Sequence, residues 1–215
     1  MEFVLDNRGL FLDGMRTTAS LTVLSFAAAL VIGAVIASFR ISPIPPLRAV
    51  GALYVGIVRN TPLALLMVVF FNGLPDAGII VQSRYLSAVI VLSAYTGAFV
   101  AETLRAGVNA VARGQGEAAR AVGLTFPQVL VIVVLPQAVR TVVAPLGSIF
   151  IALIKNSALA ALISVQDISG VTEQLITTTG DYIPLFAAAA AAYLMLSLPA
   201  GFAVSRIERR LAIKR

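Results

Sequence analysis

A few polar side chains lie within or at the ends of long apolar runs, where they could bind a polar solute. They are Arg59, Thr61, Lys155, Asn156 and Ser157. Cations and amides bind carboxylates, and hydroxyls can complete such a site. Each group costs free energy in hydrocarbon unless it has a partner or water, so a structural role stays open for each. In that alternative Arg59 pairs with an acid such as Glu102, and Lys155 extends to the membrane interface.

The chain offers no residues for bond-making chemistry. It contains no Cys and no His, which excludes thiolate chemistry, disulfides, His-ligated metals and Ser-His-Asp triads. Its lysines, Lys155 and Lys214, do not follow a glycine, so no G-x-x-x-x-G-K-[ST] phosphate loop is present. We therefore expect no enzyme activity, catalytic residue, metal or cofactor in this chain. If ATP drives it, ATP and Mg bind to a partner chain.

The composition places these residues in a membrane protein. Hydrophobic residues make up 59% of the chain and charged residues 12%, against about 45–50% and about 25% in soluble domains. A transmembrane helix needs about 20 mostly apolar residues. We expect an all-α integral membrane protein, one domain over 1–215, with about five transmembrane helices. The expected spans are 17–39, 49–71, 85–104, 137–160 and 183–205.

Some of these boundaries are ambiguous. The first run exceeds the apolar core of a cleaved signal peptide and is expected to remain as a span. Pro62 should kink the second span. The segment 124–165 is too long for one crossing and too short for two with a turn. A more polar connection over 164–182 should lead to the last span.

Basic residues indicate the orientation. Most of the 16 Lys and Arg residues fall on one side of a five-span topology, including Arg40, Arg48, Arg105 and the tail 206–215. The positive-inside rule then places the N-terminus outside and the C-terminus in the cytoplasm. The net charge of +6 is explained by this topology, and we expect no nucleic-acid partner.

A polar interruption between apolar runs predicts a short helix. Gly114 and Gly116 permit a sharp turn, Glu117 is expected in the first helical turn, where the macrodipole favours an acid, and Gly123 should end the helix after about two turns. Small side chains would let another protein approach this cytoplasmic helix closely. A surface turn lying on the headgroups is the alternative.

The spacing of this segment resembles a known signature. Glu117-Ala118-Ala119, then Gly123, Val133 and Leu135-Pro136, is similar to the EAA motif of permease subunits of bacterial ABC importers. Isoleucine is commonest where Val133 stands, which is a conservative departure. Other segments are similar to the polar amino-acid branch of that family. These segments are RNTPL at 59–63, FVAETLRAGVNAV at 99–111, PQAVR at 136–140, PLGSIFIALIKNS at 145–157 and IERRLAIKR at 207–215. Within them, the PLG, IAL-x-KN and RLA-x-K elements are similar to the actinobacterial glutamate importer permeases.

The resemblance implies a fold and a set of partners. It implies a type I importer permease in the bacterial inner membrane, in which two permease chains, identical or different, meet around a path. An extracytoplasmic binding protein would deliver a polar amino acid, with glutamate as the expected substrate, and ABC ATPase subunits would bind ATP. The short helix would transmit their motion. Its coupling residues would be Gln115, Glu117, Ala118, Ala119, Arg120 and Gly123.

The residues named first would then bind the amino acid. Lys155 and Asn156 would serve its carboxylate, and the hydroxyl groups of Thr61 and Ser157 would complete the site. Relatives usually carry two hydroxyl residues after Lys-Asn, whereas Ala158 follows Ser157 here.

Other interpretations remain open. An ATP-independent secondary transporter or channel fits the composition and the intramembrane charges, but leaves the pattern from Glu117 to Pro136 unexplained. Glu102 and Arg105 are three apart, a spacing that predicts a helical ion pair. The acids of the outward connection would form a solvated face or meet the delivering protein. They are Asp167, Glu173 and Asp181.

Overall fold

The computed structural model describes residues 7–75, 78, 81 and 83–211, and its regular elements are all helical. Hydrocarbon offers no hydrogen-bond partner to the backbone, so these apolar runs satisfy their own amides by forming helices. In chain order the elements are α2 (Arg8–Ile41), α3 (Pro45–Asn60), α4 (Leu63–Val68), a π-helix (Val69–Gly73), α5 (Arg84–Asn109), α6 (Arg113–Ala121), α7 (Phe126–Gln128), a second π-helix (Val129–Val134), α8 (Leu135–Asn156), a 3-10 helix (Ser157–Ile163), α9 (Ile168–Thr179) and α10 (Tyr182–Leu211).

Within the described residues, four helical segments are long and apolar enough to cross a membrane, or five if one bent pair is counted. The expected all-α membrane fold is confirmed. The four segments are Arg8–Ile41, Arg84–Asn109, Phe126–Ile163 and Tyr182–Arg210.

The second expected span, 49–71, is broken rather than kinked. Helix α3 ends at Asn60, and the segment Leu63–Gly73 continues at an angle of 101° to it. Thr61 and Pro62 both have extended backbone angles, with ψ of 133° and 129°. Proline removes a backbone donor and disfavours the helical conformation of the residue before it, so the helix stops instead of bending.

The ambiguous segment 124–165 forms one long crossing. Thr125 and Gln128 form a capping box that starts α7, and the helical path then runs through the π-helix, α8 and the 3-10 helix to Ile163, 38 residues in all. A crossing of this length extends beyond the bilayer core, which explains the excess over one span.

The connection over 164–182 holds a helix that the sequence interpretation did not anticipate. Asp167 caps the N-terminus of α9, where its side chain accepts a hydrogen bond from the Gly170 amide. Gly180, with a φ of 76°, ends it. Both signals are typical of helix ends and could have been read from the sequence.

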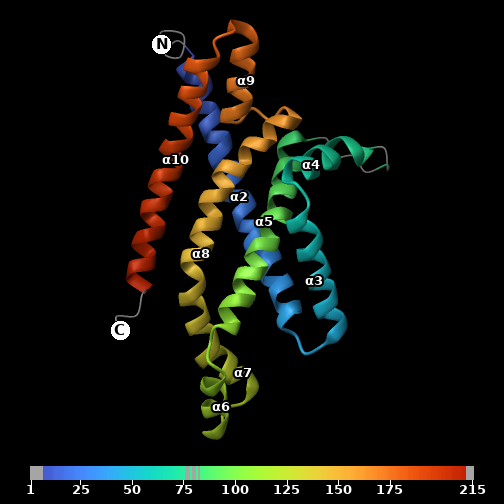
Figure 1. Cartoon of the computed structure of the whole chain (residues 1–215), viewed down its shortest axis with the longest axis vertical. Helices are drawn as coiled ribbons and strands as arrows, with labels where there is room; N and C mark the ends of the chain where they lie inside the picture. Colours follow the sequence, from blue (N-terminus) through green and yellow to red (C-terminus); the bar gives the residue numbers. More distant parts are fainter. Residues whose placement is uncertain (1–6, 76–77, 79–80, 82, 212–215) are drawn as a thin grey trace.

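The helices form an elongated bundle with two distinct ends (Figure 1). The start of α2 and helix α9 lie at one end, whereas α6 and α7 lie at the opposite end, toward which α10 also runs. Helix α2 packs along α5. At Gly33 the two backbones approach so closely that a Cβ would clash with Val100.

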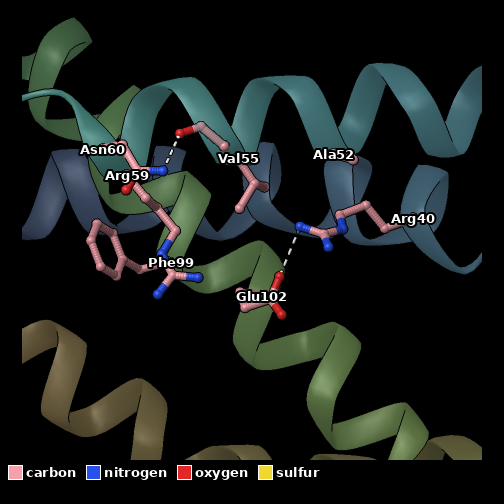
Figure 2. Close-up of a pocket in the computed structure, with 8 residues that line it drawn as sticks. Arg40, Ala52, Val55, Arg59, Asn60, Phe99 and Glu102 are labelled. Atoms are coloured by element: carbon pink, nitrogen blue, oxygen red, sulfur yellow. Dashed lines mark hydrogen bonds and ion pairs between the residues drawn. The ribbon is translucent and has the colours of Figure 1, made fainter.

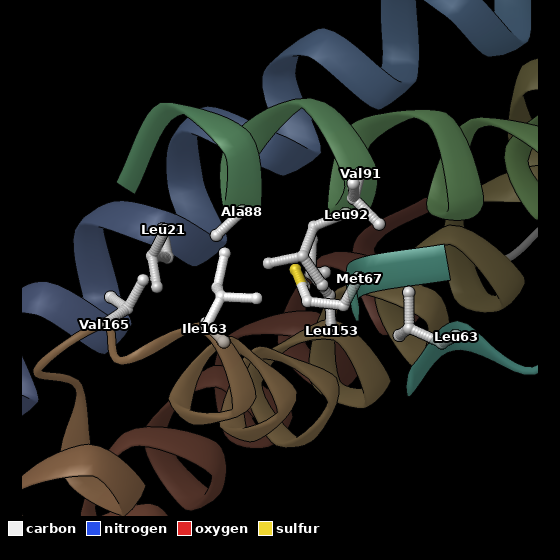
Figure 3. Packing of buried hydrophobic residues seen from close by; sticks show 10 residues of the cluster. Leu21, Leu63, Met67, Ala88, Val91, Leu92, Leu153, Ile163 and Val165 are labelled. Atoms are coloured by element: carbon white, nitrogen blue, oxygen red, sulfur yellow. The ribbon is translucent and has the colours of Figure 1, made fainter. Parts of the chain in front are cut away.

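A buried apolar cluster joins the broken crossing to the rest of the bundle (Figure 3). Leu63 and Met67 of α4 pack with Leu92 of α5, Leu153 of α8 and Ile163 of the 3-10 helix. The break after α3 is therefore held next to the C-terminal end of α8, where the polar residues from 155 to 157 lie.

Candidate functional site

Helix α6 lies beyond the membrane crossings, at one end of the bundle (Figure 1). Its last residue is Ala121, and Gly123, which follows the C-cap residue Val122, has a φ of +89° that belongs to the left-handed region. The Gly123 amide donates to the Arg120 carbonyl at 3.0 Å, and the Leu124 amide donates to the Ala119 carbonyl at 3.1 Å. The predicted short helix that ends at Gly123 is therefore confirmed.

The start of α6 differs from the expectation. The helix begins at Arg113, so Gly114 and Gly116 lie within it and do not form a turn. Glu117 consequently lies in the second turn, and the first turn holds no acid. The extended residue Ala112 makes the turn into the helix.

One side of α6 is covered by the chain itself. Helix α6 packs against the π-helix Val129–Val134, and Ala119 is buried, contrary to the expectation of an open surface of small residues. Gln115, Glu117, Ala118, Arg120 and Gly123 remain exposed. The exposed side of α6 therefore carries both positive and negative side chains, and its opposite side packs against the rest of the chain.

Arg59 occupies the last turn of α3, next to the helix break. Its guanidinium lies over the ring of Phe99, 5.0 Å from the ring centre, an arrangement in which the ring face attracts the cation. The hydroxyl of Thr61 donates to the Ile57 carbonyl at 2.8 Å. Arg59 does not form the ion pair with Glu102 that we considered from the sequence.

Glu102 instead meets two other arginines. Arg40 Nη1 lies 2.8 Å from its Oε2 atom, and Arg105 forms an ion pair with its Oε1 atom, which confirms the predicted i,i+3 pair. Gly51 makes room for Arg40 between α2 and α3, because a Cβ there would lie 2.7 Å from the Arg40 Cγ atom.

A pocket of about 450 Å³ lies between α3 and α5 (Figure 2). Arg40, Asn60, Phe99 and Glu102 join Arg59 there, and the Asn60 amide donates to the Gly56 carbonyl at 2.7 Å. Arg40, Asn60 and Phe99 were missed as site residues. Asn60 adjoins Arg59 in the sequence, but no local pattern relates Arg40 to either.

The cluster from Lys155 to Ser157 lies outside this pocket. Asn156 ends α8 and is half-buried, and Lys155 is exposed on the chain surface. Ser157 is fully buried and donates its hydroxyl to the Ile154 carbonyl at 2.8 Å. The structure therefore separates the five candidate residues into two groups.

Asp167 departs most from the expectation of a solvated acid. It is fully buried and accepts hydrogen bonds from the Gly170 amide and the Tyr193 hydroxyl, at 2.9 and 3.0 Å. Burial raises the pKa of its carboxyl to about 6, although these hydrogen bonds lower it. Glu173 and Asp181 are exposed, as expected.

Known proteins resemble this chain over nearly its whole length. Residues 16–213 match the family model described as "Binding-protein-dependent transport system inner membrane component". The probable glutamine ABC transporter permease protein GlnM of Bacillus subtilis is 35% identical over 98% of this chain and 97% of its own. The glutamate transport system permease protein GluC of Corynebacterium glutamicum is 36% identical over 95% of each chain.

Solved structures show the same architecture. A chain from the crystal structure of an amino acid ABC transporter with histidines superposes with a TM-score of 0.91, at 31% identity, over 96% of both chains. A chain of the MetNI methionine ABC transporter in an inward-facing conformation superposes with a TM-score of 0.81 over 97% of this chain and 99% of its own. At 21% identity the second likeness concerns the fold alone.

Proposed function

Because this chain belongs to the family of binding-protein-dependent transport system inner membrane components, we propose that it is the permease of an ATP-driven importer for glutamate. The observation that carries the proposal is α6, an exposed helix that projects from one end of a membrane bundle whose whole length resembles amino-acid permeases. The chain itself is a permease subunit and not an enzyme.

The orientation follows from the charge distribution. With the N-terminus outside, the end that carries α9 meets an extracytoplasmic binding protein, and the end that carries α6 meets the ATPase subunits. Two permease chains enclose the path. Because α6 is short and packs against the π-helix Val129–Val134, it moves as a unit and passes the displacement on to α8.

The polar residues near the helix break supply the substrate contacts. Lys155 and Asn156 lie at the outer end of α8, and Thr61 lies at the break between α3 and α4, which packs beside them. In this proposal Lys155 and Asn156 bind the α-carboxylate and Thr61 offers its hydroxyl. Ser157 donates its hydroxyl to the Ile154 carbonyl and so shapes the turn at the end of α8. Arg59 contributes a positive charge from the pocket between α3 and α5.

Uptake by the complete complex tests the function. The permease, its ATPase and its binding protein are reconstituted in proteoliposomes and given labelled glutamate, glutamine, arginine and histidine in turn. We expect ATP-dependent uptake of glutamate that exceeds uptake of the other three. Preferred glutamine uptake would overturn the substrate assignment, and flux through the permease alone, without ATP, would favour a secondary transporter or channel.

Lys155→Ala tests the carboxylate contact. Loss of a charge-assisted hydrogen bond costs about 1.5–3 kcal/mol, so we expect the glutamate concentration for half-maximal uptake to rise about tenfold or more, with complex assembly unchanged on size exclusion. Arg84→Ala, which removes an exposed cation at the outer end of α5, is the matched control and should leave uptake unchanged. An unaltered uptake curve for Lys155→Ala would reject this contact.

A further inference from the structure

Another pocket, of about 560 Å³, lies between α9 and α10. These two helices pack side by side at the same end of the bundle (Figure 1). The pocket reaches Ala161 in the 3-10 helix that ends the preceding crossing. Its volume falls in the range of about 300–1,000 Å³ found for small-molecule sites. It shares no lining residue with the pocket between α3 and α5.

The depth of this pocket in the membrane follows from α2. The uncharged stretch between Arg16 and Arg40 is about 35 Å long, slightly more than the bilayer hydrocarbon of about 30 Å. Thr18 therefore lies near one edge of the hydrocarbon, and its hydroxyl accepts a hydrogen bond from the Ile168 amide at 3.2 Å. From that edge α9 continues toward the end of the bundle (Figure 1). Glu173, in its second turn, therefore lies at headgroup level.

Much of the pocket lining is apolar. Ala161, Phe186 and Ala190 contribute to it. Tyr193 also lines the pocket, and its hydroxyl already donates to Asp167 at 3.0 Å. Within the described part of the chain, no lysine or arginine lines the pocket. The pocket therefore suits a hydrocarbon chain, whereas a free amino acid would find no cation for its carboxylate.

The charge of the pocket comes from Glu173. Among the residues that the structure describes, it is the only charged side chain in the lining. It is exposed and forms no ion pair with any of them. A carboxylate beside apolar walls attracts a cation, and the rings of Tyr182 and Phe186, which line the same pocket, attract a cation through their faces.

We propose that this pocket binds a phospholipid with a primary-amine headgroup, such as phosphatidylethanolamine, whose ammonium is bound by Glu173 and whose acyl chain lies along α10. A primary ammonium donates hydrogen bonds, and a hydrogen bond to a carboxylate is charge-assisted. A choline headgroup carries methyl groups in place of these hydrogens, and a glycerol headgroup carries no cation. The pocket therefore distinguishes lipids by their headgroups.

The lipid completes the packing of α9. One side of this helix is buried, where Val171 and Leu175 pack with Phe11 of α2 and Leu185 of α10. The pocket lies between α9 and α10, so a lipid in it contacts both helices. A ligand that binds only the folded state stabilises that state. Phosphatidylethanolamine should therefore raise the Tm of the chain.

Substitution of Glu173 tests the ammonium contact. The full chain is purified from nanodiscs that contain equal amounts of phosphatidylethanolamine, phosphatidylcholine and phosphatidylglycerol with identical acyl chains, and native mass spectrometry counts the retained lipids. The unaltered chain should retain phosphatidylethanolamine over phosphatidylcholine about fivefold or more, because only the former donates a charge-assisted hydrogen bond. In Glu173→Gln this ratio should fall below about twofold, because the charge is lost.

Glu208→Gln is the matched control, because Glu208 is an exposed acid near the other end of α10 and does not line the pocket. It should keep the ratio of the unaltered chain. Equal retention of the three lipids by the unaltered chain, or a preference for phosphatidylglycerol, would overturn the proposal. So would a preference that survives Glu173→Gln, or the same loss in Glu208→Gln.

Ala190→Leu tests the space for the acyl chain without changing the charge. Ala190 and Ala191 are both exposed on α10, but only Ala190 lines the pocket. Leucine forms helix almost as well as alanine, so α10 is preserved. Ala190→Leu should lower the retention of phosphatidylethanolamine severalfold, and Ala191→Leu should not. Equal retention by these two variants would place the acyl chain elsewhere and overturn the proposal.

A second copy of this chain is the alternative occupant of the pocket. The chain contains no cysteine, so Ala190→Cys supplies a single thiol. After oxidative cross-linking in membranes the chain should stay monomeric on a denaturing gel, because lipid covers this site. A cross-linked dimer would assign the pocket to a second copy and overturn the proposal. Lipid retention and cross-linking are measured without transport, so a failure of the importer function leaves both results unaffected.

Discussion

The buried carboxyl of Asp167 joins two helices, α9 and α10. Its side chain accepts hydrogen bonds from Gly170 in α9 and from Tyr193 in α10. The neighbouring Ile168 amide donates to the Thr18 hydroxyl of α2 at 3.2 Å. The N-terminus of α9 is therefore fixed to both of the flanking long helices.

The raised pKa of Asp167 predicts a pH-dependent stability. Its folded pKa of about 6 exceeds the value of about 3.9 for an unfolded chain, so the folded state binds the proton more tightly. Stability should therefore fall as the pH rises from about 4 to about 7, by an amount on the order of 3 kcal/mol at most, and stay level above that.

Asp167→Asn should remove this dependence, because an amide oxygen can still accept from Gly170 and does not titrate. The check is Tm by circular dichroism of the purified chain from pH 4.5 to 8. Asp181→Asn, which changes an exposed acid, should keep the slope of the unaltered chain. Parallel curves for Asp167→Asn and the unaltered chain would contradict the prediction.

At the scale of the element, α6 depends on the left-handed residue that ends it. Gly123 has a φ of +89°, which a β-branched side chain adopts only with strain. Gly123→Val should loosen the end of α6 and reduce copurification of the ATPase severalfold, while the Tm of the bundle changes little. The readouts are ATPase pull-down and ATP-driven uptake.

Gly114→Ala is the matched control for that variant. Gly114 lies inside α6, where a Cβ would meet no atom within 4 Å, and alanine is the better helix former. It should preserve coupling. Full coupling in Gly123→Val would show that the helix end does not matter.

At the scale of the whole molecule, the bundle relies on the close approach of α2 and α5. A side chain at Gly33 would clash with Val100, and overpacking of this kind costs about 1–3 kcal/mol. Gly33→Leu should therefore lower the Tm of the detergent-purified chain. Gly9→Leu, on the same helix but in open space, should not, and equal Tm values for the two variants would contradict this packing argument.

The sequence by itself determined the features that depend on contiguous residues. The apolar runs predicted a helical membrane bundle, Gly123 predicted the end of α6, and the spacing of Glu102 and Arg105 predicted their ion pair. Each of these depends on the bilayer or on neighbours within a turn or two, so the local pattern carries the information.

Only the tertiary structure decided which distant groups meet. It paired Glu102 with Arg40, placed Arg59 over Phe99, and buried Asp167. These arrangements depend on how separate helices pack against each other, which the periodicity of one helix does not encode. Helix packing therefore created the pocket between α3 and α5, because it brought charges from three helices to one place.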